Sequence, residues 1–310
     1  MMRVVENDMA PSKRQLILRG IKIADSAIYR QDKIWSQYSN DKVDIGEHLA
    51  LILRILGKAL PLNKKIRALS VGSSNEPQFR ILQTGCQGGL YLLDIDKSSL
   101  EIIKERLRRQ NTRNVMTILQ NFNNIFNNPA KTIRFRHKFL QDKKVDLVAL
   151  HHSLYYCPQE SWIELFRNLY KNILAPVGVM HAVLMTNKSD NHSSTTWLYN
   201  HFAGKFCRHE NNQSLEKLKR ALKKERLFAG SRILFKTRSI QFFVDDFERM
   251  MAVVWMILLH PFVHEYNFGQ KEEITELIYN QFYKKKKPIL QIQDHLAVYR
   301  GLHFTPIVTD

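Results

Sequence analysis

Short apolar segments alternate with amphipathic segments from residue 66 to residue 185, and this alternation leaves few architectures open to the chain. Each apolar segment is long enough for one buried strand, and the segments between carry apolar residues at helical spacing. Strands that alternate with helices form βαβ units, which build a parallel sheet covered by helices on both faces. The sequence therefore predicts an α/β fold with a doubly wound sheet. The expected strands are 66–71, 90–94, 115–119, 145–150 and 179–185.

Helices are predicted in the segments that separate these strands. The clearest is 98–110, where apolar residues recur on one face and charged residues occupy the other. Helices are also expected at 79–84 and 162–174. Pro176 and Gly178 predict a turn between the last of these helices and the fifth strand.

The residues on either side of this pattern are mainly helical. Asp44 is expected to cap a helix in the N-terminal part, with Glu47 as its capping-box partner. Residues 191–227 are polar and helical, with no strand expected before 239–244. A capped apolar helix, a second helix and a last strand are then expected at 247–259, 272–283 and 289–300. We therefore expect three parts: a helical cap at 1–60, a cofactor-binding α/β domain at 61–190, and a helical insert with the closing strands at 191–310.

Composition supports a folded, basic protein. The chain has 310 residues, is 44% hydrophobic and carries a formal net charge of +18, so it can bury a large core. Its basic residues are concentrated at 97–144, 205–238 and 284–287. Such clusters can bind nucleic acid or another polyanion, but solvated helix faces are often basic as well. Charge alone leaves both interpretations open.

Neither a membrane segment nor a metal site is expected. The N-terminus lacks the apolar region of a secretory signal, and the longest apolar run, 250–259, is about half of the ~20 residues that a bilayer span needs. These features predict a cytoplasmic protein. The three cysteines show no metal-ligand spacing. His260 and His264 have that spacing, but Pro261 interrupts the helix between them.

Small or polar residues follow the first three predicted strands, at the edge where parallel sheets bind ligands. The first strand leads into Gly72-Ser73-Ser74-Asn75, a loop that lets backbone N–H groups approach a ligand. Asp94 ends the second strand, where a carboxylate can accept hydrogen bonds from both hydroxyls of a ribose. Asn121 and Phe122 follow the third strand and suit the edge and the face of an adenine. These residues predict a nucleoside cofactor.

A cluster of histidines and tyrosines follows the fourth strand and predicts the reaction zone. One of His151 and His152 is expected to face the site, and His152 can act as a general base near pH 7. Tyr155 and Tyr156 are expected to line the pocket beside it. Cys157 lies several residues past the strand end, where a buried thiol is more plausible than the nucleophile of covalent cytosine methylation.

The order and spacing of these motifs resemble those of the class I S-adenosylmethionine-dependent methyltransferases over residues 45–187. The similarity is closest at Leu93-Asp94-Ile95-Asp96 and at Val145-Asp146-Leu147-Val148. The first loop departs from the family pattern, because its stretch from Leu69 to Glu76 retains only the first glycine. The resemblance implies a Rossmann-like, doubly wound, mostly parallel sheet of seven strands. It also implies S-adenosyl-L-methionine as the cofactor.

The resemblance assigns roles to individual residues. The cofactor-binding residues that it implies are Gly72, Ser73, Ser74, Asn75, Glu76, Asp94, Ile95, Asn121, Phe122 and His151. His152 and Tyr155 are the expected catalytic residues, and Tyr155, Tyr156 and Tyr38 the expected substrate-binding residues. Tyr38 precedes the domain, where many relatives have a helix that closes over the cofactor. It can equally be part of the core.

The acceptor of the methyl group is expected to be a small molecule. Two stretches, 69–72 and 154–156, resemble histamine N-methyltransferase, which acts on a small amine. The tetrads Asn-Pro-Pro-Tyr and Asp-Pro-Pro-Tyr, which the family uses to methylate exocyclic base nitrogens, are absent after the fourth strand. We therefore expect in-line transfer that yields S-adenosylhomocysteine. Two alternatives stay open: an RNA methyltransferase that uses the basic clusters, and a catalytically silent, methyltransferase-like binding module.

Overall fold

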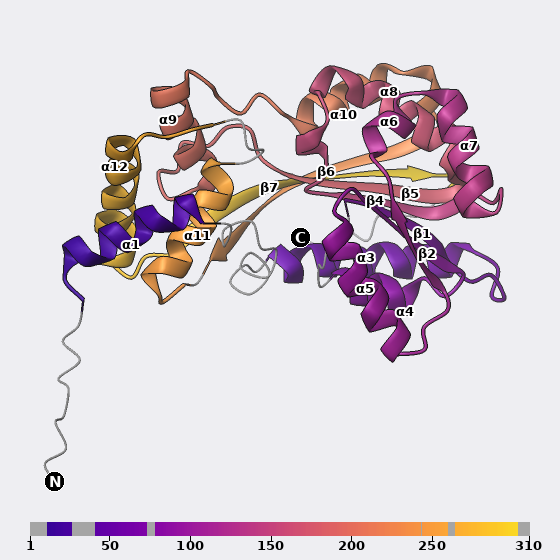
Figure 1. Cartoon of the computed structure of the whole chain (residues 1–310). Coiled ribbons are helices and arrows are strands. Elements are labelled where there is room, and N and C mark those ends of the chain that lie inside the picture. The colour runs from indigo at the N-terminus through magenta and orange to yellow at the C-terminus, as the bar shows by residue number, and fades with distance from the viewer. Residues whose placement is uncertain (1–10, 27–40, 73–77, 243, 260–263, 303–310) are drawn as a thin grey trace, which may run out of the picture.

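The computed structural model describes residues 11–26, 41–72, 78–242, 244–259 and 264–302 (Figure 1). In these ranges, seven strands form one sheet in the order β3-β2-β1-β4-β5-β7-β6. Neighbouring strands are parallel, except that β7 runs antiparallel to β5 and β6. The order reverses between β1 and β4, which is the switch point of a doubly wound sheet. The predicted Rossmann-like, mostly parallel α/β fold is confirmed. The strands are β1 Arg67–Val71, β2 Gly89–Asp94, β3 Val115–Leu119, β4 Val145–His151, β5 Leu174–Met185, β6 Ser231–Phe242 and β7 Ile289–Arg300.

The central strands match their predicted positions because they are buried on both faces. Every residue of β1 and of β4 is buried, and β2 is buried up to its last residue, Asp94. Such strands appear in the sequence as nearly continuous apolar runs, which are simple to locate. The predicted third strand agrees with β3 residue for residue, and β7 occupies the segment in which the last strand was expected.

Helices cover both faces of the sheet (Figure 1). On one face α3, α4 and α5 pack around a core that includes Leu49, Leu90 and Ile103. On the other face α6, α7, α8 and α10 surround a core that includes Phe135 and Leu165. The helices of these two layers are α3 Asp41–Ala59, α4 Gln78–Gly85, α5 Lys97–Arg109, α6 Phe122–Phe126, α7 Pro129–Leu140, α8 Trp162–Asn168 and α10 Leu215–Lys224. Shorter turns lie at Leu154–Tyr156, Gln159–Ser161, Leu169–Ile173 and Arg226–Phe228.

Four further helices form a second body, which we call the helical lobe: α1 Lys13–Asp25, α9 Thr195–Cys207, α11 Phe247–Leu258 and α12 Phe268–Ile278, continued by the turn Tyr279–Tyr283. The lobe has its own apolar core, and the indole of Trp255 donates a hydrogen bond to Gly20 O across it (2.8 Å). It lies beside the end of the sheet at which β7 begins (Figure 1). There Thr196 Oγ1 donates to Thr186 O, just past the end of β5 (3.0 Å). The segment 1–60 therefore supplies α1 to the lobe and α3 to one face of the sheet.

Three local predictions were wrong. Pro176 and Gly178 make no turn but lie within β5, where the register against β4 shifts between Val145 and Leu147. Such a bulge absorbs residues that a regular strand cannot pair. The strand expected at 239–244 begins much earlier, at Ser231. It was missed because β6 is an edge strand with many exposed positions and little apolar signal.

The third error concerns Asp44, which lies inside α3 and does not cap a helix. Its side chain points away from the helix, toward β7, and forms hydrogen bonds there. Among the described residues, no helix combines the length and the apolar character needed to cross a membrane.

Candidate functional site

The carboxyl end of β1 approaches the segment after β4 very closely. Gly72 follows β1 with φ of +67°, and its N–H donates to Leu93 O in β2 (2.8 Å). A Cβ at position 72 would lie 2.5 Å from Cβ of Ser153. The hydroxyl oxygen of Ser153 is buried and has no hydrogen-bond partner among the described residues. The predicted loop residues Ser73, Ser74, Asn75 and Glu76 lie outside the described residues.

Two carboxylates at the end of β2 have separate tasks. Asp96 caps α5, because its side chain accepts hydrogen bonds from Ser98 N (2.9 Å) and Ser99 Oγ (2.5 Å). Asp94 is half-buried at the strand end, where Oδ1 accepts from Asp96 N (2.9 Å). The helix cap is thus supplied without Asp94. Ile95 between them is 60% exposed.

At the end of β3, the two predicted adenine-binding residues differ in their exposure to solvent. Asn121 is exposed and caps α6, accepting a hydrogen bond from Asn123 N (2.9 Å). Phe122 is 7% exposed and packs into the core above the sheet. Sequence reasoning missed Asn123, whose Nδ2 donates to Tyr156 O (2.6 Å) and whose Oδ1 is buried without a partner in the described residues.

The segment after β4 forms a compact polar group. His152 has φ of +51°, and its Nδ1 lies 3.4 Å from the hydroxyl of Tyr155. That hydroxyl accepts a hydrogen bond from Met185 N at the end of β5 (2.6 Å). Tyr156 is 44% exposed. The predicted reaction zone is therefore held together at the ends of β4 and β5. Tyr38 lies outside the described residues.

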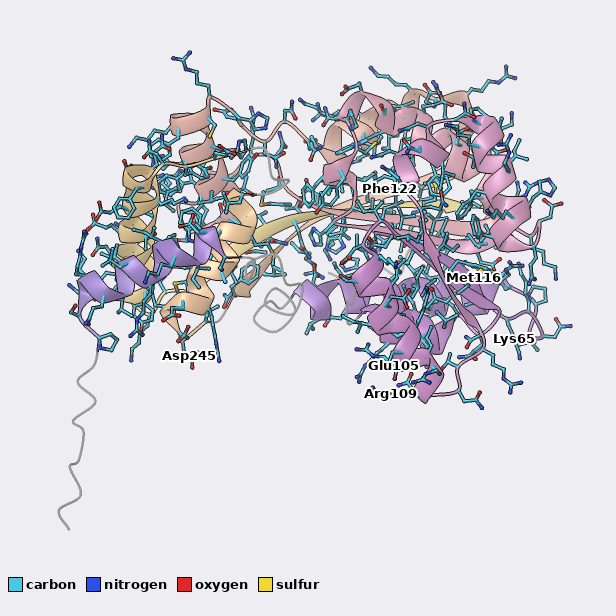
Figure 2. All side chains as sticks on the ribbon, in the orientation of Figure 1. Lys65, Glu105, Arg109, Met116, Phe122 and Asp245 are labelled. Carbon is cyan, nitrogen blue, oxygen red and sulfur yellow. The ribbon has the colours of Figure 1, made fainter. Side chains whose placement is uncertain are left out.

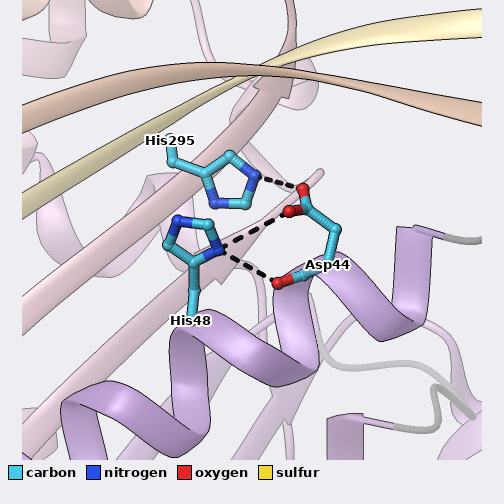
Figure 3. Close-up of side chains that lie close together, drawn as sticks. All are labelled: Asp44, His48 and His295. Carbon is cyan, nitrogen blue, oxygen red and sulfur yellow. Dashed lines mark hydrogen bonds and ion pairs between the residues drawn. The ribbon is translucent and has the colours of Figure 1, made fainter. Parts of the chain in front are cut away.

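A line of buried histidines crosses the sheet toward α3. We call His151, His181 and His295, from β4, β5 and β7, the histidine row. Nε2 of His151 lies 3.0 Å from Nδ1 of His181, and Nε2 of His181 lies 3.3 Å from Nδ1 of His295. Nε2 of His295 lies 2.7 Å from Oδ2 of Asp44, and the ring of His48 stacks on that of His295 (Figure 3). Of this group, only His151 was predicted as a site residue.

Burial fixes the charge states in this group. Burial, together with the neighbouring imidazoles of His151, His295 and His48, holds the pKa of His181 well below its usual range. Burial opposes ionisation of Asp44, but hydrogen bonds from His295 and Gln293 hold the pKa of that carboxyl below its usual range. At neutral pH a neutral imidazole therefore lies in the middle of the row and a carboxylate at its end.

The thiol beside the reaction zone is not activated. Cys157 is buried, and burial raises the pKa of its thiol to about 11. Such a thiol carries little thiolate near pH 7, so it is a poor nucleophile. The structure thus agrees with the expectation of a buried thiol.

No protein-family model matches the chain, and no curated protein sequence matches it. Three solved structures illustrate what the fold is similar to. A candidate methyltransferase from Bacillus halodurans aligns over 80% of this chain and 98% of its own, with 11% identity and a TM-score of 0.49. The YcgJ protein from Bacillus subtilis aligns over 80% and 98%, with 10% identity and a TM-score of 0.48. Phosphoethanolamine N-methyltransferase 2 from Haemonchus contortus, solved with phosphomonomethylethanolamine and S-adenosylhomocysteine, aligns over 81% and 52%, with 13% identity and a TM-score of 0.44.

The comparisons do not show the shorter resemblance to histamine N-methyltransferase. One fold hosts many reactions, so the activity depends on the residues of the site.

Proposed function

We propose that the chain is an S-adenosylmethionine-dependent methyltransferase that acts on a small-molecule acceptor. The observation that carries the proposal is the pairing of Gly72 with Ser153 at the switch point of the sheet. There a left-handed glycine brings two backbone segments together, beside a buried hydroxyl that has no partner among the described residues. A ligand group bound between β1 and β4 would satisfy that hydroxyl, because buried polar groups are rarely left unpaired.

The residues at the neighbouring strand ends fit a nucleoside. Asp94 stands at the end of β2, where a carboxylate can accept hydrogen bonds from ribose hydroxyls. Asn123 presents its buried Oδ1 from the start of α6, so it can accept a hydrogen bond from an exocyclic amine. We assign this role to Asn123 rather than to Asn121, because the side-chain oxygen of Asn121 already caps the helix.

The group after β4 can position an acceptor and hold its proton. When bound, S-adenosylmethionine supplies an electrophilic methyl group, whose transfer requires chiefly in-line alignment. The hydrogen bond from Met185 N fixes the hydroxyl of Tyr155, and the same oxygen can accept a second hydrogen bond from Nδ1–H of His152. Nε2 of the neutral imidazole would then carry no hydrogen and could take up a proton, and Tyr156 offers an exposed ring. His152 and Tyr155 are thus proposed to orient the acceptor, and His152 to take up its proton.

The charge pairing on α5 favours a small acceptor over RNA. On α5, Lys104 pairs with Glu101, and both Arg108 and Arg109 pair with Glu105. Figure 2 shows Glu105 and Arg109 together on that helix. Pairing within the helix weakens the positive field that a phosphate backbone would need.

Calorimetry with S-adenosylmethionine tests the cofactor assignment. We expect binding of one equivalent by the full chain. The Asp94→Asn variant should bind about 10- to 100-fold more weakly, since hydrogen bonds to a charged group contribute about 1.5–3 kcal/mol. Asp96→Asn is the matched control, because it perturbs the same turn without removing the proposed ribose contact. Absence of binding by the native chain, or equal affinities of the two variants, would refute the assignment and favour a silent binding module.

The acceptor class is tested with labelled cofactor and a cell extract. We expect label in a small molecule and little in RNA. An RNA methyltransferase would instead bind RNA with an affinity that falls by roughly 10³- to 10⁵-fold between 50 and 200 mM salt if it makes six to ten phosphate contacts. Such binding, together with label in RNA, would replace the small-molecule proposal.

A further inference from the structure

Two residues of α3 and one of β7 bring three potential metal ligands together. Asp44 and His48 are one helical turn apart, so their side chains share a face of α3, and that face meets His295 (Figure 3). One ligand atom from each residue lies within 4.8 Å of the others. We propose that Asp44, His48 and His295 form a mononuclear site for a divalent transition-metal ion of the zinc class. This site is separate from the proposed contacts to S-adenosylmethionine.

The donor types select the class of ion. Two imidazole nitrogens and one carboxylate suit zinc, iron, nickel or copper, whereas calcium and magnesium prefer oxygen ligands alone. Three protein ligands leave at least one coordination position for water or a bound molecule. The site is therefore of the open kind, which can bind a further ligand.

The observed spacing is close to that of a coordinated ion. Oδ2 of Asp44 lies 2.7 Å from Nε2 of His295, and Oδ1 of Asp44 lies 3.7 Å from Nδ1 of His48. Donor atoms around one zinc ion lie roughly 3 to 3.5 Å apart, because each metal–ligand bond is about 2.0–2.2 Å long. The three ligand atoms lie within 4.8 Å of one another, so coordination requires them to approach by roughly 1 Å and Nδ1 of His48 to leave its contact with Asp44 O (3.0 Å).

The surrounding hydrogen bonds would orient the ligands. Gln293 Nε2 donates to Oδ2 of Asp44 (2.7 Å), and Nδ1 of His295 faces Nε2 of His181 (3.3 Å). Metal-binding histidines usually donate their second ring N–H to a hydrogen-bond acceptor, which fixes the tautomer, and here that acceptor would be Nε2 of His181. With the ion on Nε2 of His295, Nδ1–H would donate to His181, and His181 Nδ1–H would donate to Nε2 of His151. The histidine row would thus connect the ion to the strand end beside the reaction zone.

One nearby charge opposes the ion and provides a sharp test. Nε of Arg238, on β6, lies 3.8 Å from Oδ1 of Asp44, and its side chain is 43% exposed. Because a cation repels a bound metal ion, Arg238→Ala should tighten metal binding. Loss of a ligand should weaken it, so the two kinds of variant are expected to move in opposite directions.

The experiment uses the full chain after removal of metals with a chelator. Calorimetry with Zn²⁺ and the visible absorption of added Co²⁺ both report binding without any measurement of activity. We expect one tight equivalent, at least tenfold weaker binding by His48→Ala and Asp44→Asn, and tighter binding by Arg238→Ala. His48 and Asp44 are used because His295 is 3% exposed, and its replacement risks misfolding.

His137→Ala is the matched control for binding by surface histidines, since His137 is 58% exposed and lies on α7. It should leave the tight equivalent unchanged. If no tight equivalent is found, or if His48→Ala and His137→Ala bind Zn²⁺ alike, the metal site does not exist. Because these readouts do not involve S-adenosylmethionine, their failure is distinguishable from failure of the proposed methyltransferase activity.

Discussion

Gly72 and Ser153 lie so close that a Cβ on residue 72 would be 2.5 Å from Cβ of Ser153. Gly72 also has φ of +67°, a left-handed conformation that costs other residues about 1–2 kcal/mol. We therefore expect Gly72→Ala to lower the free energy of unfolding by about 2 kcal/mol or more, because strain and contact add. The same change should weaken S-adenosylmethionine binding. Urea denaturation and calorimetry measure the two effects.

Gly57→Ala is the control for this change. Gly57 lies inside α3, and a Cβ there would have no heavy atom within 4 Å. Alanine should stabilise the helix by about 0.5–1 kcal/mol and leave cofactor binding unchanged. Similar destabilisation by both substitutions would contradict the special role of position 72.

The cap of α5 predicts a pH-dependent loss of stability. Burial opposes ionisation of Asp96, but hydrogen bonds from Ser99 and Ser98 hold the pKa of the carboxyl below its usual range. A lowered pKa stabilises the fold above the unfolded pKa, and this stabilisation disappears as the pH falls through the folded pKa. Asp96→Ala should therefore cost about 1 kcal/mol near pH 7.

The pH series decides whether the carboxylate is responsible. As the pH falls through the usual range of aspartate pKa values, the unfolded chain is protonated first and native Asp96 only at lower pH, so the difference between native and variant chains should shrink. Urea denaturation from pH 7 down to about pH 3 measures this difference. A constant difference across that range would show that the loss at position 96 does not depend on the carboxylate.

Features determined by neighbouring residues were predictable from the sequence. The N-cap of α11 is one example, since Asp246 accepts a hydrogen bond from Arg249 N, three residues further on (2.8 Å). Buried strands such as β4 were located because both of their faces are apolar. Local periodicity and capping leave a signal in a short stretch of sequence.

Features that join distant segments left no such signal. Asp44 and His295 are 251 positions apart in the sequence. They meet only because α3 packs on the face of the sheet to which His295 of β7 points. The register places both His151 and His295 opposite Val183, which aligns the histidine row across three strands. In the sequence, His151 and His181 lie 30 positions apart, and His181 and His295 lie 114 positions apart. The antiparallel placement of β7 between β5 and β6 was needed to bring them together.

The amino-terminal end of β4, opposite the proposed site, should contribute to the free energy of unfolding. Asp146 is 1% exposed, and its carboxylate accepts hydrogen bonds from Arg67 N (3.0 Å) and Lys64 Nζ (2.6 Å). Asp146→Ala leaves the buried N–H of Arg67 without its acceptor and removes the partner of the 40% exposed Lys64, which should cost about 1–3 kcal/mol. Asp142→Asn should cost less than about 1 kcal/mol, because Asp142 is 53% exposed and asparagine tolerates the left-handed φ of +55° at this position.

Thermal denaturation and calorimetry together test whether Asp146 contributes to stability and not to cofactor binding. Asp146 lies at the start of β4, whereas the proposed site lies at its end. The Asp146→Ala variant should therefore bind S-adenosylmethionine normally at a temperature at which it is folded. A large loss of affinity with little loss of stability would contradict this expectation.

The packing of α1 predicts a local opening of the helical lobe. A Cβ at Gly20 would lie 2.8 Å from Cγ2 of Thr275 and 2.9 Å from Cγ of Met251, so α1 approaches α11 and α12 closely there. The carbonyl of Gly20 also accepts the hydrogen bond from the indole of Trp255 (2.8 Å). Gly20→Val should therefore cost about 1–3 kcal/mol through overpacking.

Hydrogen exchange distinguishes a local from a global effect of this change. Amides of α1 should exchange faster in Gly20→Val, while amides of β1 and β4 keep their protection, because these strands belong to separate apolar cores. Leu18→Ala, on the same helix but 37% exposed, should leave the exchange of α1 nearly unchanged. Equal exchange of the α1 amides in the native chain and in Gly20→Val would show that the contact of α1 with α11 and α12 contributes little to stability. Faster exchange throughout the sheet would instead show that the helical lobe and the sheet unfold as one unit.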